Sequence, residues 1–437
     1  MQNQGIRDAR SLGTPKMLVL GLQHMFAMFG ATVLVPALTG LSVSATLLFA
    51  GLGTLFFHFL TKGKVPAFLG SSFAYLAGYA AIAPNGETAL LPYACVGVAA
   101  SGLLYLILSA LVRGFGANRV MRFFPPVVTG PIIICIGMTL ANSAINNCTG
   151  SWDIALVAII TVVVFNIWGK GMLRIIPILL GVLVSYVYAA IPGRVDFSGV
   201  ASAAWIGLPV KMENTVFSLI GNCDMNLLVT AVIAIMPIAF ATMIEHIGDI
   251  CAISSTVGEN FIADPGLHRT LLGDGLATTI ASLFGAPANT TYGENTGVLA
   301  LSRVHDPRVI RLAALYAMVL SFSPAFAYLV NTIPAAIIGG VSFILYGMIS
   351  AIGVRNVVEN RVDFTNSRNL IIAAVILVCG LGFTDGLTFH VGGVTITLTS
   401  LAVAAIAGIV LNAILPGNDF HFGKSESGDD VASLGRY

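Results

Sequence analysis

The chain has 437 residues, of which 57% are hydrophobic and only 9% are charged, and its formal net charge is +1. A soluble globular domain carries about 25% charged residues. The composition therefore excludes a soluble globular protein and predicts a polytopic membrane protein. The balanced net charge gives no sign of a nucleic-acid partner.

A membrane-spanning helix needs about 20 mainly apolar residues. By this measure the sequence predicts an all-α membrane protein with fourteen transmembrane segments, the first of which runs on without the cleavage site of a signal peptide. The third and tenth segments are irregular, because each begins with small polar residues. The predicted segments are 17–38, 43–61, 65–83, 89–112, 123–141, 152–168, 172–191, 226–255, 268–285, 288–303, 309–332, 334–352, 368–384 and 393–415.

The distribution of positive charge predicts how these segments are oriented. With the N-terminus placed inside and the segments alternating, all but two of the 21 Lys and Arg residues fall on the inner side. The two exceptions are Arg194 and Lys211. Because cytoplasmic loops are enriched in Lys and Arg, we expect a cytoplasmic (inner or plasma) membrane protein with both termini in the cytoplasm. The inner set includes Lys424 and Arg436 in the polar C-terminal end.

The six cysteines are scattered and show none of the close spacing of a metal site. Most fall within apolar runs, which favours free thiols that pack in the interior. A bridge between Cys148 and Cys223 stays open, because both are predicted on the outer side.

Two short polar stretches suggest an internal repeat. Gly-Ser-Ser-Phe-Ala at 70–74 resembles Asn-Thr-Thr-Tyr-Gly at 289–293, and each lies in the third segment of a seven-segment half. Because seven is odd, the two halves would have opposite orientations in the membrane. Many secondary transporters have this 7+7 inverted-repeat plan, with the substrate site at the broken helices. The alternative is that both stretches are close-packing surfaces between helices.

Charged residues at membrane depth are the main candidates for function. Glu294 follows the second polar stretch, near the start of a half-helix whose free N–H groups could donate to a ligand. Glu245 and Asp249 are four residues apart on the eighth segment, so they share a helix face, and His246 lies beside Glu245. A charge at a helix centre costs about 2.5–3.5 kcal/mol. Such a cluster suits proton uptake and release, and the alternative is a polar cluster that only ties helices together.

Aromatic residues at matching positions indicate a site for a flat ring. Phe73 and Tyr292 belong to the two polar stretches, and base–aromatic stacking contributes about 1–3 kcal/mol. Tyr346 in the twelfth segment is a weaker candidate. Gln23 and His24 in the first segment are expected to support the tenth segment or Glu294.

No P-loop, nucleophile elbow, zinc-protease or dinucleotide-binding motif occurs in a suitable context. We therefore expect neither an enzyme nor a cofactor or metal site, and active transport would have to use an ion gradient.

These stretches resemble the nucleobase–ascorbate transporters (the nucleobase:cation symporter-2 family), and within that family the bacterial uracil-transporting members. The similar stretches are 23–36, 70–74, 245–246, 264–269, 289–295 and 294–303. Together they are spread over nearly the whole chain.

The resemblance implies a core domain formed by 17–117 (spans 1–4) and 225–333 (spans 8–11). It implies a gate domain formed by 118–192 (spans 5–7) and 334–415 (spans 12–14). Spans 3 and 10 would each begin as a short strand, and the two strands would meet as an antiparallel pair. The substrate would lie between that pair and span 8, and two protomers would form a homodimer.

The resemblance also implies roles for single residues. The carboxylates of Glu245 and Glu294 would bind the N–H groups of a pyrimidine, and the backbone amides of Phe73 and Gly293 would meet a carbonyl oxygen. The residues expected to enclose the ring are Ala31, Phe73, Tyr292 and Tyr346. Those expected in proton coupling are Glu245, Asp249 and His246, and those expected to support the site are His24, Gln23 and Asn295.

Two details refine this expectation. Glu294 stands where purine-transporting members usually carry Gln, and a carboxylate, which only accepts, suits the imide N–H of uracil. Asp249 stands where some uracil-transporting members have His, which leaves the proton relay open.

The sequence thus predicts a proton-coupled uracil importer in which the core slides against the gate like an elevator, with sodium as an alternative coupling ion. The alternatives are a xanthine or urate transporter of the same family, an anion exchanger on a related scaffold, and a channel-like protein.

Overall fold

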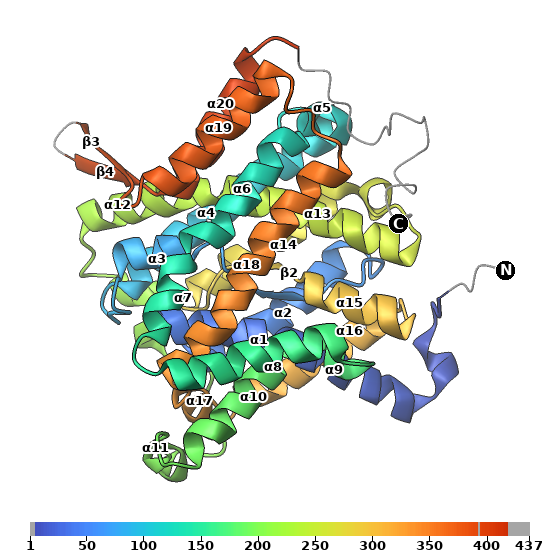
Figure 1. Ribbon diagram of the computed structural model, residues 1–437, viewed down its shortest axis with the longest axis vertical. Coiled ribbons are helices and arrows are strands. Elements are labelled where there is room, and N and C mark those ends of the chain that lie inside the picture. The colour runs from blue at the N-terminus through green and yellow to red at the C-terminus, as the bar shows by residue number, and fades with distance from the viewer. Residues whose placement is uncertain (1–4, 392–393, 418–437) are drawn as a thin grey trace.

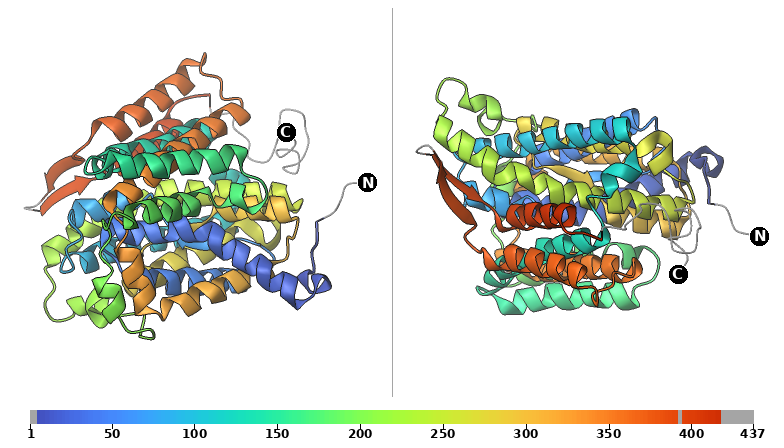
Figure 2. Two further views of the ribbon diagram at one scale, coloured as in Figure 1. Left: turned by 60° about the horizontal axis from the view of Figure 1, so that its bottom comes forward. Right: turned by 90° about the horizontal axis from the view of Figure 1, so that it is seen from above.

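The computed structural model describes residues 5–391 and 394–417, and these are mostly helical (Figure 1). Lys424, Arg436 and the polar C-terminal end therefore lie outside the described residues. The helices pack into two sets, which Figure 2 shows as two layers. One set holds α1, α2, α4, α12, α13, α14 and α16, and the other holds α6, α7, α8, α10, α18, α19 and α20.

The first half of the chain follows the predicted segments closely, except that the third is broken. Its strand and α-helices are α1 (Thr14–Thr39), α2 (Val43–Leu60), β1 (Leu69–Ser71), α3 (Leu76–Ile82), α4 (Leu91–Phe115), α5 (Ala117–Met121), α6 (Pro126–Thr139), α7 (Ala141–Cys148), α8 (Trp152–Trp168), α9 (Met172–Ile175), α10 (Pro177–Ala190) and α11 (Ser198–Ser202). Short helical turns are η1 (Ala9–Leu12), η2 (Met212–Asn214) and η3 (Val216–Leu219).

The second half repeats this pattern, with a break in its own third segment. Its elements are α12 (Met225–Ile235), η4 (Met236–Ile238), α13 (Ala239–Val257), η5 (Ile262–Gly266), α14 (Leu267–Leu283), β2 (Asn289–Thr291), α15 (Gly293–Ser302), α16 (Pro307–Ser321), α17 (Pro324–Asn331), α18 (Ala335–Glu359), α19 (Ser367–Gly382), β3 (Leu387–Val391), β4 (Val394–Leu398) and α20 (Ser400–Ile414).

Many spans are shorter or more bent than the sequence suggests. Within the described ranges, six helices are long and apolar enough to cross a membrane alone, and a bent pair would make a seventh. The other predicted spans are broken by strands, as at α3 and α15, or are shorter helices such as α8, α10, α19 and α20.

The prediction of one continuous span at 309–332 is wrong. The chain bends by 88° between α16 and α17. Pro324 has no N–H to continue the helical hydrogen bonds, and Ser323 caps the new helix by accepting a hydrogen bond from the Phe326 N–H. A capping residue followed by proline is a helix-start signal, and here it outweighs the apolar composition.

A second correction concerns residues 387–398, where a β-hairpin replaces the start of the predicted last span. β3 and β4 pair antiparallel, with Val391 opposite Val394, and the sequence between them is Gly-Gly. β-branched residues alternating on both sides of a Gly-Gly pair are a hairpin signature. β4 packs against α12, so the hairpin joins the two helix sets.

The structure contains no disulfide between Cys148 and Cys223, which the sequence had left open. Cys148 is buried and Cys223 is exposed, and both are free thiols.

Candidate functional site

Two short strands cross at the centre of the molecule and begin the site. β1 and β2 pair antiparallel, with Gly70 opposite Thr290. The pairing extends beyond the strands, because the Tyr292 N–H donates to the Phe68 carbonyl (3.0 Å). The predicted antiparallel pair in the third and tenth segments is therefore present, and it breaks both helices at the same depth.

Side chains from neighbouring helices satisfy the free edges of this small sheet. Thr54 on α2 accepts a hydrogen bond from the Leu69 N–H (2.9 Å), and Thr278 on α14 donates to the Asn289 carbonyl (2.8 Å). The Asn289 amide donates to the Phe49 carbonyl on α2 (3.0 Å). Because irregular backbone at membrane depth needs internal partners, these contacts explain why polar residues occupy both predicted breaks.

Tyr292 fixes the crossing point against α1. Its hydroxyl donates to the Ser71 carbonyl (2.8 Å) and lies 3.3 Å from the Thr32 hydroxyl. Its ring occupies the place where a side chain at Gly70 would lie, so only glycine fits at that position. The Tyr292 ring is therefore held in one position, and its hydroxyl is already hydrogen-bonded within the protein.

The acidic residues of α13 face this crossing. Asp249 accepts a hydrogen bond from the Thr291 hydroxyl (3.1 Å), and its Oδ1 lies 3.8 Å from a Cβ built at Gly293. Glu245, one turn earlier, is close enough to Glu294 for their charges to repel each other. The sequence-predicted acidic pair is thus brought to one junction between α13 and α15.

This junction is partly exposed, and two of its three carboxylates have no side-chain hydrogen-bond partner in the ranges that the structure describes. Glu245, Asp249 and Glu294 are half-buried, whereas Gly248 and Gly293 are exposed. Within the described part of the chain, neither Glu245 nor Glu294 forms a hydrogen bond to another residue's side chain. Two carboxylates can therefore accept N–H groups from a ligand.

Phe73 meets Tyr346, which comes from the other helix set. Phe73 follows β1, Tyr346 lies on α18, and their rings meet edge to face with centroids 6.2 Å apart. Ala31 on α1 is buried nearby in the same apolar cluster. The predicted ring-enclosing residues thus come from both helix sets.

Asn295 and His24 tie α15 to α1. The Asn295 amide donates to the His24 carbonyl (3.0 Å) and lies 3.2 Å from His24 Nδ1. Gln23 instead lines a separate groove with residues of the N-terminal arm. No group of three or more His, Cys, Asp or Glu that could hold a metal ion occurs among residues 5–391 and 394–417.

His246 on α13 lies deeper than the acidic residues of the same helix and shares the Thr291 hydroxyl with Asp249. It is fully buried between the rings of Phe57 and Tyr105, and its Nδ1 lies 3.6 Å from Asp274 Oδ2 and 3.4 Å from the Thr291 hydroxyl.

Sequence reasoning missed Asp274, a fully buried carboxylate on α14. It also missed Thr291, which contacts both Asp249 and His246. The signal for Asp274 was present in the sequence, because an ionisable residue within an apolar segment is itself a functional-site candidate.

Inverted broken helices that carry carboxylates are how secondary transporters build a substrate site, and the fold and this junction together define a multi-pass membrane transporter. The chain belongs to the Permease family, whose profile matches residues 15–389. This confirms the resemblance stated from the sequence motifs, and a permease is not an enzyme.

Two relatives match over nearly their whole length. The uracil permease of Bacillus caldolyticus is 42% identical over 423 residues, which cover 94% of this chain and 94% of the relative. The uracil permease of Bacillus subtilis (strain 168) is 40% identical over 430 residues, which cover 95% of each.

The fold also has a solved counterpart. The transmembrane domain of a cyanobacterium bicarbonate transporter, BicA, matches with a TM-score of 0.62 at 15% identity, covering 88% of this chain and 99% of that chain. At this identity the likeness concerns the fold alone, and it confirms the predicted 7+7 inverted repeat.

Proposed function

We propose that this chain imports uracil by proton symport. The observation that carries the proposal is the junction at which Glu245 and Glu294 lie close together with their carboxylates free. Uracil has two N–H groups and two carbonyl oxygens, so a pair of acceptors beside free backbone amides matches its edge. The two relatives named uracil permeases, at 42% and 40% identity, support the same substrate.

In this proposal the pyrimidine lies between α13 and the β1–β2 crossing. Glu245 and Glu294 accept its N–H groups, and the backbone amides of Phe73 and Gly293 donate to a carbonyl. The exposed backbone at Gly293 and the absence of a side-chain cap on α15 leave such a donor available. Phe73, Tyr346, Tyr292 and Ala31 enclose the ring, with Tyr292 acting as a fixed wall.

We assign the coupling proton to the Glu245 and Asp249 carboxylates. Repulsion between Glu245 and Glu294 falls when one of them is neutral, so protonation favours binding of a neutral base and release of the proton disfavours it. The Thr291 hydroxyl contacts both Asp249 and His246, so it connects the two side chains. Sodium is the alternative coupling ion.

The two helix sets correspond to the proposed core (17–117 and 225–333) and gate (118–192 and 334–415). In the proposed elevator motion the core carries the β1–β2 crossing, and Tyr346 on the gate forms the facing wall. We also propose cytoplasmic termini, because the predicted alternation of segments puts all but two Lys and Arg residues on the inner side, and assembly as a homodimer.

Uptake of radiolabelled uracil into proteoliposomes tests the proposal. An inward proton gradient should drive accumulation above equilibrium, and collapsing the gradient with a protonophore should abolish it. Accumulation that requires sodium without a proton gradient would reassign the ion, and stronger competition by xanthine than by unlabelled uracil would reassign the substrate.

A further inference from the structure

An apolar groove lies away from the substrate junction, where the N-terminal arm packs against α1 and the end of α15. We name it the α1 groove. Its volume is about 430 Å³, and it is lined by Ile6, Leu12, Pro15, Lys16, Val19, Leu20, Gln23, Ser302 and Val304. In Figure 1 these elements meet on the right, near the start of the blue helix α1.

The arm that forms one wall of the groove is firmly attached. The Ile6 N–H donates to the Arg303 carbonyl (2.8 Å), and the His305 N–H donates to the Ile6 carbonyl (2.9 Å). The Ala9 N–H donates to the Asp306 carboxylate (2.8 Å). The groove is therefore a built feature of the fold and not a gap beside a loose terminus.

The other wall continues onto the outer face of α1. Val19 is 55% exposed and Leu22 is 39% exposed, although both lie on a helix of a membrane protein. Such residues face lipid, so the groove opens directly onto the hydrocarbon of the bilayer. An acyl chain can enter it without crossing water.

Some of the charged side chains near the groove form ion pairs and others do not. Arg7 pairs with Glu259, and Arg308 pairs with both Asp8 (2.7 Å) and Asp306 (3.1 Å). These pairs occupy the nearby carboxylates.

Lys16, which lines the groove, forms no ion pair or hydrogen bond in the described ranges. The same is true of the side chain of Arg303, which stands in the chain between the two lining residues Ser302 and Val304. The mouth of the groove therefore carries positive charge that the protein leaves unmatched.

The start of α1 adds backbone donors at the same place. Gly13 caps the helix without any side-chain hydrogen bond, and Pro15 and Lys16 in its first turn line the groove. Pro15 has no N–H, so the donors of this turn are the backbone N–H groups of Thr14 and Lys16, because the first amides of a helix have no partner within the helix, and a helix N-terminus favours a phosphate. Lys16 and these amides thus present two kinds of phosphate-binding group beside an apolar slot.

We propose that the α1 groove binds one phospholipid with an anionic headgroup. The phosphate lies at Lys16 and the start of α1, and one acyl chain lies along Val19 and Leu20. The groove's floor includes the end of α15, so a bound lipid braces the half-helix that carries Glu294. Uracil transport itself does not depend on this inference, and the inference does not depend on the substrate.

Native mass spectrometry of the purified full chain tests the proposal directly. The protein is released from micelles doped with phosphatidylglycerol or, in parallel, with phosphatidylcholine. We expect one retained phosphatidylglycerol at concentrations where phosphatidylcholine is not retained. Equal retention of the two lipids would overturn the proposal.

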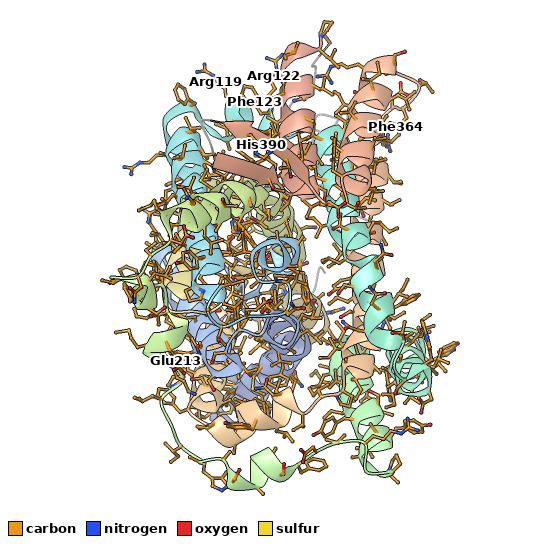
Figure 3. The ribbon with its side chains drawn as sticks, turned by 90° about the vertical axis from the view of Figure 1, so that its left-hand side faces the viewer. Arg119, Arg122, Phe123, Glu213, Phe364 and His390 are labelled. Carbon is orange, nitrogen blue, oxygen red and sulfur yellow. The ribbon has the colours of Figure 1, made fainter. Side chains whose placement is uncertain are left out.

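Two variants separate the headgroup from the chain. Lys16→Gln combined with Arg303→Gln should weaken phosphatidylglycerol retention by roughly fivefold per cation removed. Val19→Trp fills the apolar slot without changing charge and should also weaken it. The matched controls are Arg119→Gln combined with Arg113→Gln, and Leu103→Trp on an exposed surface of α4. Arg119, labelled in Figure 3, lies on α5, which packs against α4.

The remaining outcomes are also decisive. Loss of retention in the control variants as large as in the groove variants would show nonspecific attraction and contradict the site. Competition by soluble glycerol phosphate as strong as that by phosphatidylglycerol would identify a free-anion site instead. Because wild-type selectivity is measured first, a variant that fails to fold does not leave the question open.

Discussion

The three carboxylates at the junction differ in what holds them. Asp249 accepts a hydrogen bond from Thr291, whereas Glu245 and Glu294 have no such side-chain partner among the described residues. A carboxylate without a protein donor is ready to accept a ligand N–H, and one with a donor is held in place. This difference supports a binding role for the two glutamates, with the proposed coupling role shared between Glu245 and Asp249.

Glu294→Gln tests the binding role. The change keeps the shape of the side chain but replaces a charged acceptor, and a hydrogen bond to a charged group contributes about 1.5–3 kcal/mol. We expect uracil affinity, measured by equilibrium binding to the purified protein, to fall by roughly 10- to 100-fold. Glu213→Gln, at an exposed residue labelled in Figure 3, is the matched control. Unchanged affinity in Glu294→Gln would remove this residue from the site.

Thr291→Val tests the positioning of Asp249. Valine matches threonine in shape but cannot donate to the carboxylate. We expect proton-driven uracil accumulation to fall by roughly tenfold, which corresponds to a lost hydrogen bond to a charged group, while counterflow exchange at fixed pH falls less. Thr290→Val is a close control, since the Thr290 hydroxyl has no hydrogen-bond partner in the described structure. Equal losses in both variants would point to strand damage.

At the level of elements, the β1–β2 crossing is what makes the site possible. Each strand is followed by a half-helix, and because the strands are antiparallel, the chain leaves the pair at opposite ends, through Phe73 after β1 and through Gly293 after β2. The crossing depends on close approach of the two chains. Tyr292 packs over Gly70, and its hydroxyl binds the end of β1.

Gly70→Ala tests this close approach. The added methyl group would overlap the Tyr292 ring, and overpacking a tight interior costs about 1–3 kcal/mol. We expect a lower unfolding temperature and a higher uracil KM, because Tyr292 must move away from Ser71. Gly114→Ala on α4 meets open space and serves as the control. A variant with wild-type KM and stability would show that the crossing tolerates more room than its geometry indicates.

At the scale of the whole molecule, the two helix sets meet through close side-chain contacts. Phe73 meets Tyr346 across the junction, and Gly30 on α1 packs against Ile178 on α10. A motion of one set against the other must break such contacts.

A disulfide across the sets tests that motion. A Cβ built at Gly30 lies 3.4 Å from the Ile178 Cβ, close to the range of about 3.5–4.5 Å found in disulfides. Gly30→Cys with Ile178→Cys should therefore cross-link on oxidation, and uracil uptake should stop and recover with a reductant.

The control is a cross-link within one set. A Cβ built at Gly130 on α6 lies 3.6 Å from the Val357 Cβ on α18. Gly130→Cys with Val357→Cys should form a disulfide and leave uptake intact. Full uptake by the oxidised Gly30→Cys and Ile178→Cys variant would argue against an elevator motion.

The sequence by itself determined the membrane class, the two broken segments and the acidic candidates, because composition, polar interruptions and charge at membrane depth are properties read along the chain. The tertiary structure decided what depends on packing between distant segments. It set the rotation of α13 that turns Asp249 toward Thr291 and His246 toward Asp274. It also replaced the apolar run at 394–398 with a strand and bent the chain at Pro324. Apolar composition alone does not distinguish a helix from a strand, nor a straight span from a bent one. The two alternatives bury the same side chains, and the choice between them depends on which segments pack against them.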